Sequence, residues 1–162
     1  MGLPRPILLK RINNELSECS DYLKTRIIPV PGDSEFPVEI EVTMRNIPAY
    51  ALDGDDVVHI SDHAFLLILS EEYGYRKPEI RWQTPIFHPN IMMPDDGGYV
   101  CLRTADAWEF GSRLLSFVKS VEQLVMSPNP KSPFGTESCM KASRFYLENQ
   151  SRFEVSVNYR RG

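Results

Sequence analysis

Cys101 is the residue best placed in this sequence to act as a nucleophile. It follows PDDGGY, residues 94–99, in which two glycines permit positive backbone angles and leave few side chains to cover a thiol. A lone cysteine is more often a small buried apolar residue, and Cys19 and Cys139 fit that description because each lies on an apolar helical face. The sequence therefore predicts one exposed thiol, at Cys101.

The three cysteines show no spacing typical of redox or metal chemistry. They are far apart, without a C-x-x-C pair or a Cys/His set, so we expect free thiols. His59 and His63 could share one face of a helix, but they fall in strand-like sequence and lack further ligands. We therefore expect no metal ion and no cofactor.

His88 is the base that a cysteine hydrolase would need, and it opens a His88-Pro89-Asn90 triplet upstream of the thiol. A turn explains the triplet better. Pro89 fixes the backbone, Asn90 can fold back on it, and an imidazole at a turn can bond to nearby main chain. We favour this structural role for His88 and keep hydrolysis as an alternative.

Hydrophobic periodicity predicts the elements that must position this loop. After two early prolines, apolar residues from Leu8 to Cys19 recur with helical spacing, which predicts an amphipathic helix. Apolar and polar residues then alternate over 38–45, the pattern of a half-buried strand. Further strands are expected at 57–60, 63–70 and 79–83. The short links between them indicate an antiparallel meander.

The second half of the sequence is mostly helical in its pattern. A broad apolar stripe covers 114–125 and ends before SPNPKSP, whose prolines cannot continue a helix. A further helix is expected over 136–148, and a last amphipathic piece follows Ser151. The prediction is one α+β domain over residues 1–162: an antiparallel four-stranded meander sheet with an N-terminal helix, a central helix packed on the sheet and C-terminal helices.

Charge and composition exclude two classes of partner. The chain has 162 residues, 42% of them hydrophobic, and a net charge of -4. Between Asp33 and Glu72, ten acidic residues stand against one basic residue, Arg45, so this region would repel a nucleic-acid backbone. No stretch is long and apolar enough to cross a bilayer, and the first residues lack a signal-peptide pattern. We expect no nucleic-acid partner, no membrane insertion and a cytoplasmic location.

The order of these motifs resembles the core of the ubiquitin-conjugating enzymes. That family is marked by HPN, a single cysteine soon after it, a tryptophan, an apolar helix and PNPxxP. Here the corresponding residues are His88-Pro89-Asn90, Cys101, Trp108, the stretch 114–125, Pro128-Asn129-Pro130 and Pro133. YGYRKPEIRWQTPIFHPN, residues 73–90, resembles the family's YPFKPP loop and following strand, and LLKRINNEL, residues 8–16, resembles its first helix. The resemblance covers nearly the whole chain and is weakest over residues 19–62.

The resemblance implies a carrier mechanism. Cys101 would take the C-terminal glycine of ubiquitin or a ubiquitin-like modifier from an activating enzyme as a thioester, then yield it to a substrate lysine or a ligase cysteine. The Asn90 amide would stabilise the oxyanion of that transfer, or brace the loop before Cys101, and both roles stay open. Ser132 stands where many members have an acidic residue that orients the lysine, and it would do so by hydrogen bonding. His88, Pro89 and Trp108 would have structural roles near the site.

The same resemblance assigns partner surfaces. Lys10, Arg11 and Asn14 correspond to the family's binding site for activating enzyme and ligase on the first helix. Tyr75 takes the place of a loop aromatic that docks on RING-type or other ligases. Phe110 follows Trp108 and Glu109, where the family usually has Ser-Pro or Thr-Pro. We therefore expect this chain to prefer other ligases than typical members of the family.

One departure from the family pattern and one alternative function are kept. The segment between Asn90 and Cys101 is a few residues longer than is usual in the family, which implies a reshaped loop if the Asn90 amide is to reach a thioester. A non-catalytic relative, an RWD-like interaction module, could keep the fold without the chemistry. Such relatives usually lack the cysteine, so Cys101 argues against that function.

Overall fold

The computed structural model describes residues 2–23, 30–102 and 106–149. The first element is helix α1 (Arg5–Glu18), which starts after Pro4 and carries a second proline in its first turn, a position where a missing N–H costs no hydrogen bond. Leu8, Ile12 and Leu16 are buried along one face of the helix. The predicted amphipathic helix is therefore confirmed.

A three-stranded antiparallel sheet forms the centre of the structure. In spatial order it contains β1 (Val38–Met44), β4 (His63–Leu69) and β5 (Glu79–Trp82). Alternate residues of β4 are buried, because successive side chains of a strand point to opposite faces and one face is covered. The α+β class, the antiparallel pairing and the strands expected in these three regions are confirmed.

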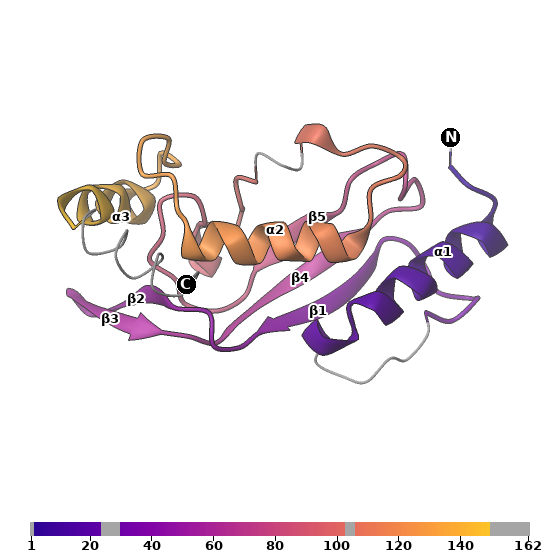
Figure 1. The fold of residues 1–162 in the computed structure, drawn as a ribbon, viewed down its shortest axis with the longest axis horizontal. Helices are drawn as coiled ribbons and strands as arrows, with labels where there is room; N and C mark the ends of the chain where they lie inside the picture. The colour runs from indigo at the N-terminus through magenta and orange to yellow at the C-terminus, as the bar shows by residue number, and fades with distance from the viewer. Residues whose placement is uncertain (1, 24–29, 103–105, 150–162) are drawn as a thin grey trace, which may run out of the picture.

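The expected four-stranded meander is wrong in its strand arrangement. Strands β2 (Ala49–Asp53) and β3 (Asp56–Ile60) form a separate two-stranded hairpin, and β1 pairs directly with β4. Residues 45–48 face only residues 61–62 between the two ladders. Asn46 has a φ of 61° there, and Pro48 has no N–H to donate, so the ladder is interrupted and the hairpin continues beyond the sheet (Figure 1).

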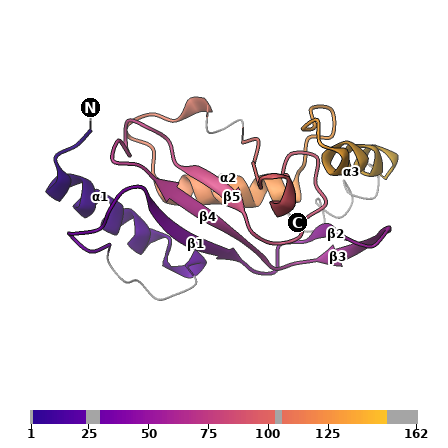
Figure 2. The same ribbon diagram turned by 180° about the vertical axis from the view of Figure 1, so that it is seen from behind.

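Helix α2 (Leu114–Met126) lies along one face of the sheet, with α1 at one end of the molecule (Figures 1 and 2). Its inward face is apolar throughout. The buried residues are Leu114, Phe117, Val118, Val121 and Val125. They join the buried residues of the sheet and of α1 in one hydrophobic cluster, which supplies the main driving force for folding. The predicted central helix and its packing on the sheet are confirmed.

Helix α3 (Glu137–Glu148) lies at the opposite end of the molecule from α1, above the β2–β3 hairpin (Figure 1). Thr136 caps it, since its hydroxyl oxygen accepts the backbone N–H of Cys139 at 3.2 Å. The Tyr50 ring of β2 contacts Phe145 and Tyr146 at centroid distances of 5.2 and 5.9 Å. The helix expected over 136–148 is confirmed, and the piece expected after Ser151 lies outside the described residues.

Two short 3-10 helices complete the described elements, η1 (Ser20–Tyr22) and η2 (Pro94–Asp96). All three cysteines are free thiols, with Cys19 and Cys139 buried and Cys101 exposed, as the sequence predicts. Within the described ranges, no helix combines the length and the apolar character that crossing a bilayer requires.

Replacing Phe65 by alanine tests the assignment of the inward face of the sheet. The Phe65 side chain is fully buried and stacks on Trp82 at a centroid distance of 5.7 Å. We expect Phe65→Ala to lower the free energy of unfolding by about 3–5 kcal/mol, measured by urea denaturation. Leu66→Ala on the opposite, half-buried face should cost less than about 2 kcal/mol. Equal losses would contradict the assignment.

Candidate active site

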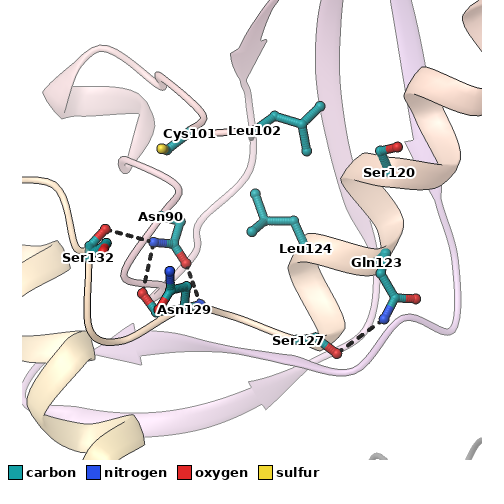
Figure 3. A pocket seen from close by; sticks show the side chains of 9 residues that line it. All are labelled: Asn90, Cys101, Leu102, Ser120, Gln123, Leu124, Ser127, Asn129 and Ser132. Atoms are coloured by element: carbon teal, nitrogen blue, oxygen red, sulfur yellow. Dashed lines mark hydrogen bonds between the residues drawn. The ribbon is translucent and has the colours of Figure 1, made fainter. Parts of the chain in front are cut away.

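The Cys101 thiol is exposed at the edge of a cavity of about 320 Å³ that runs beside the C-terminal half of α2 (Figure 3). The lining combines apolar side chains with uncharged polar ones. Its residues are Asn90, Cys101, Leu102, Ser120, Gln123, Leu124, Ser127, Asn129 and Ser132. The site therefore joins three segments, which are the residues around Asn90 and Cys101, helix α2, and the loop that follows this helix.

The long segment between Asn90 and Cys101 closes on itself. The backbone N–H of Met92 donates to the Tyr99 carbonyl at 2.8 Å, and η2 turns the chain between them. The N–H of Cys101 then donates to the Asn90 carbonyl at 2.9 Å. The additional residues thus project outward as a turn, and Cys101 returns to the backbone of Asn90.

Gly98 attaches this turn to the sheet. Its carbonyl accepts the N–H of Trp82 in β5 at 2.8 Å. Gly98 has a φ of 66°, and a Cβ atom there would lie 2.7 Å from the Trp82 carbonyl oxygen. Only glycine fits this close approach without displacing backbone, so the glycine pair has a structural reason besides leaving the thiol uncovered.

The Asn90 side chain is buried and braces the loop after α2. Its Nδ2 donates to the carbonyls of Asn129 and Ser132 at 3.0 and 3.1 Å, and its Oδ1 accepts the N–H of Asn129 at 2.7 Å (Figure 3). Both amide hydrogens are therefore engaged. The side chain thus braces the 129–132 loop, whereas the loop before Cys101, which the sequence analysis expected it to brace, is joined to Asn90 through the backbone carbonyl. Donation to an oxyanion would require Nδ2 to release a carbonyl, and that role stays a prediction.

His88 is fully buried, and both of its ring nitrogens have backbone partners. The N–H of Asn90 donates to Nδ1 at 3.0 Å, so Nδ1 must be unprotonated and Nε2 carries the hydrogen that is donated to the Leu124 carbonyl at 2.9 Å. Burial lowers the pKa of His88 to about 4. A buried imidazole with no free lone pair cannot serve Cys101 as a base, which contradicts the hydrolase alternative.

The loop at 129–134 is tied down at several points besides Asn90. The N–H of Phe134 donates to the carbonyl of the buried Pro89 at 3.0 Å, and the Ser143 hydroxyl of α3 donates to the Pro130 carbonyl. The Ser132 N–H donates to the Asn129 carbonyl at 3.3 Å. Ser132 therefore lines the same cavity as Cys101, and its expected role in orienting a lysine stays a prediction.

The residues assigned to partner binding lie at the α1 end of the molecule. Lys10 and Asn14 are exposed on α1, while the side chain of Arg11 is only 15% exposed. Tyr75 and Phe110 are 61% and 44% exposed, and their ring centroids are 4.6 Å apart. The structure thus brings Arg11, Tyr75 and Phe110 together, since the Arg11 guanidinium carbon lies 4.7 Å from the Phe110 ring.

Trp108 holds the two loops of this surface together. Its indole Nε1 donates to the Gly74 carbonyl at 3.0 Å. Its ring packs against Tyr73 and Phe117 at centroid distances of 5.8 and 6.1 Å. Trp108 therefore supports the surface formed by Tyr75 and Phe110, since it lies in the loop that carries Phe110 and contacts the loop that carries Tyr75.

Sequence reasoning missed Glu15. This glutamate is fully buried, and its carboxylate contacts Arg11, Tyr73 and the backbone of Leu114. The sequence could have indicated it, because Glu15 falls on the apolar face of the first helix. A charged residue on such a face needs a hydrogen-bonding partner that is buried with it. Within the described ranges, no three His, Cys, Asp or Glu side chains are grouped so that they could hold a metal ion.

Comparisons with known proteins point to one family. The family model described as Ubiquitin-conjugating enzyme matches residues 60–160. Ubiquitin-conjugating enzyme E2 N of Macaca fascicularis is 29% identical over 137 residues, which are 84% of this chain and 80% of that protein. Ubiquitin-conjugating enzyme E2 T of Bos taurus is 36% identical over 70 residues, 40% of this chain and 34% of that protein.

Solved structures show the same fold. The E2 domain of a Toxoplasma gondii ubiquitin conjugating enzyme aligns with a TM-score of 0.63 and 17% identity, over 91% of this chain and 92% of that one. Ubc12 of S. cerevisiae aligns with a TM-score of 0.62 and 22% identity, over 93% of this chain and 76% of that one. At these identities the likeness concerns the fold.

Acid is expected to destabilise the folded state through His88. Because burial lowers its pKa from 6.5 to about 4, the unfolded chain binds a proton between these pH values that the folded chain does not. Stability therefore falls as the pH decreases from 6.5, by about 2–3 kcal/mol at pH 4.5. Urea unfolding at pH 7 and 4.5 should show a smaller loss in His88→Gln than in the wild type. The same loss in both would exclude His88 as its source.

Proposed function

This chain belongs to the ubiquitin-conjugating enzyme family, and we propose that it carries ubiquitin or a ubiquitin-like modifier as a thioester on Cys101. The modifier would come from an activating enzyme and pass to a substrate lysine, usually with a ligase. The observation that carries the proposal is an exposed thiol at the edge of a cavity whose lining side chains are uncharged. A flexible peptide tail can reach such a thiol without displacing the core.

The loading step is a thioester exchange, in which the modifier passes from one cysteine to another. The Cys101 thiol gives its proton to solvent, and the thiolate attacks the carbonyl carbon of the modifier's C-terminal glycine, which is bound to a cysteine of the activating enzyme. The new carbon–sulfur bond forms as the old one breaks, and the departing thiolate of the activating enzyme takes up a proton. Leu102 and Leu124 line the cavity beside the thiol and offer apolar contact to the bound tail.

A carrier must also keep its thioester until an acceptor arrives. Among the described residues that line the cavity, none has an imidazole or a charged side chain that could activate water. His88 is close in sequence, but its nitrogens are engaged with Asn90 and Leu124. This arrangement favours storage of the acyl group over its hydrolysis.

Transfer to lysine requires a neutral amine and a place for the developing oxyanion. The Asn90 amide lines the same cavity as Cys101 and is the candidate donor, and it also holds the 129–132 loop through its bonds to the carbonyls of Asn129 and Ser132. Ser132 would orient the amine by hydrogen bonding, since a hydroxyl is a poor base. The acceptor amine would therefore lose its proton to solvent or to a group that the substrate or ligase supplies.

Partners would bind at the α1 end, away from the thiol. We assign the activating enzyme and ligases to the surface formed by Lys10, Asn14, Tyr75 and Phe110, with Arg11 beneath it. Exposed charge on α1 favours fast association and exchange, which a shuttle between two partners needs. The cytoplasmic location stays a prediction.

The carrier role predicts a thiol-sensitive adduct. Incubation with an activating enzyme, ATP and modifier should give a product, shifted on a gel, that dithiothreitol removes. Cys101→Ala should form none, because the nucleophile is absent, whereas Cys139→Ala keeps the exposed thiol and should still be loaded. No adduct with the wild type would favour a non-catalytic interaction module, and an adduct on Cys101→Ala would place the carrier elsewhere.

Asn90→Ala is expected to keep loading and to slow transfer to free lysine by about 10²-fold, because both the oxyanion donor and the loop brace are removed. Single-turnover discharge of preformed thioester measures this rate. Transfer at the wild-type rate would exclude any role for Asn90.

Ser143→Ala separates the two roles of Asn90. It removes another tie of the same loop, the bond to the Pro130 carbonyl, and leaves the Asn90 amide in place. If bracing dominates, Ser143→Ala also slows discharge to lysine. If oxyanion donation dominates, its discharge rate stays close to that of the wild type.

A further inference from the structure

The Glu15 carboxylate of α1 lies at the meeting point of three chain segments. It is fully buried and accepts hydrogen bonds from Arg11 Nε at 2.7 Å, the Tyr73 hydroxyl at 2.8 Å and the backbone N–H of Leu114 at 2.9 Å. Leu114 is the first residue of α2, so a side chain of α1 caps the start of α2. A buried carboxylate with three donors is well compensated and fixed in position.

Arg11 is held in turn by Glu15 and by the loop before α2. Its Nη2 donates to the Ser112 carbonyl at 2.8 Å, while Nε is bound to the carboxylate. The guanidinium carbon lies 4.7 Å from the Phe110 ring and 5.3 Å from the Tyr73 ring, in the range of cation–π contact. The guanidinium of Arg11 therefore makes its main contacts within the molecule, with Glu15, Ser112 and the two aromatic rings.

Gly74 and Phe110 form one interlocked unit with Arg11. Gly74 has a φ of 107°, and a Cβ atom there would lie 2.9 Å from Arg11 Nη1 and 3.2 Å from Phe110 Cε2. The space of a side chain at position 74 is thus filled by the guanidinium and the ring. Position 74 corresponds to the first proline of the family's YPFKPP loop, and position 110 follows Trp108 where the family usually has Ser-Pro or Thr-Pro, so the two departures from the family pattern lie against each other.

This packing leaves two aromatic rings in contact on the surface, those of Tyr75 and Phe110. Tyr75 and Phe110 meet at a centroid distance of 4.6 Å with an angle of 36° between their planes. A ring pair whose geometry is already set loses less conformational freedom on binding than two independent side chains. Whatever fixes this pair therefore affects partner affinity without touching the partner.

We propose that the ion pair between the partly buried Arg11 and the fully buried Glu15 positions the Tyr75–Phe110 ring pair, and that Glu15 is a positioning residue for ligase docking. The docking part rests on the proposed function. Arg11 then acts mainly through Phe110, from beneath the surface, and not as an exposed charge that contacts the ligase.

Glu15→Gln is the variant that releases Arg11 selectively. Glutamine keeps one acceptor oxygen for Tyr73 and Leu114 but turns an amide group, a donor, toward Arg11 Nε. The matched control is Glu18→Gln, since Glu18 pairs with Arg113, also links α1 to the start of α2, and is exposed. Arg11→Lys is a second test variant, because an ammonium cannot hold Glu15 and Ser112 and lie flat against a ring.

The hydrogen-exchange rate of the Trp108 indole N–H reports how firmly the two loops that carry Tyr75 and Phe110 are held together, in the absence of any partner. This group donates to the Gly74 carbonyl, between the two loops. We expect its exchange, followed by NMR and assigned with Trp108→Phe, to be about tenfold faster in Glu15→Gln and Arg11→Lys. Glu18→Gln should match the wild type. Unchanged exchange in both test variants, with melting temperatures near that of the wild type, overturns the proposal.

Ligase stimulation tests the functional consequence. The ratio of ligase-stimulated to ligase-independent thioester discharge should fall about tenfold in Glu15→Gln, and Glu15→Gln/Phe110→Ala should be no worse than Phe110→Ala alone, because coupled residues are not additive. Additive losses would overturn the proposal. A wild type that forms no adduct refutes the proposed function and the docking role together, and indole exchange then decides whether Glu15 positions the rings.

Discussion

The buried turn at residues 88–90 is the constraint on which the site depends. His88 bonds to the Leu124 carbonyl of α2, Asn90 bonds to the loop at 129–132, and the Asn90 carbonyl receives the N–H of Cys101. One turn thus sets the relative positions of three segments that are far apart in the sequence. Since leaving one of these buried groups unpaired costs about 1–3 kcal/mol, none of the segments can move without disturbing the others.

Helix α2 connects this turn to the surface assigned to partners. Its first N–H is bound by the Glu15 carboxylate from α1, and near its other end the Leu124 carbonyl is bound by His88. Both ends are held by buried polar groups, and the apolar face between them packs on the sheet (Figure 1). The thiol and the exposed aromatic rings are therefore attached to opposite ends of one rigid element.

Two loops that depart from the family's usual pattern, the segment before Cys101 and the loop at Gly74, are packed against the rest of the structure. The longer segment before Cys101 is closed by the Met92–Tyr99 hydrogen bond and by Gly98 against β5, so Cys101 returns to the backbone of Asn90. Lengthening a surface loop costs little free energy once its ends are fixed. The glycine at position 74 is matched by Arg11 and a phenylalanine, so this loop too remains packed.

The sequence by itself determined the helices, most strands, the burial of Cys19 and Cys139 and the exposure of Cys101, because periodicity and glycine-rich loops are local properties of the chain. Tertiary structure alone decided that β1 pairs with β4 past the β2–β3 hairpin, that the Asn90 amide turns to the 129–132 loop, and that Glu15 receives donors from Tyr73 and Leu114. A hydrogen-bond partner is chosen by which distant segments the fold brings within about 3 Å, and no local pattern encodes that choice.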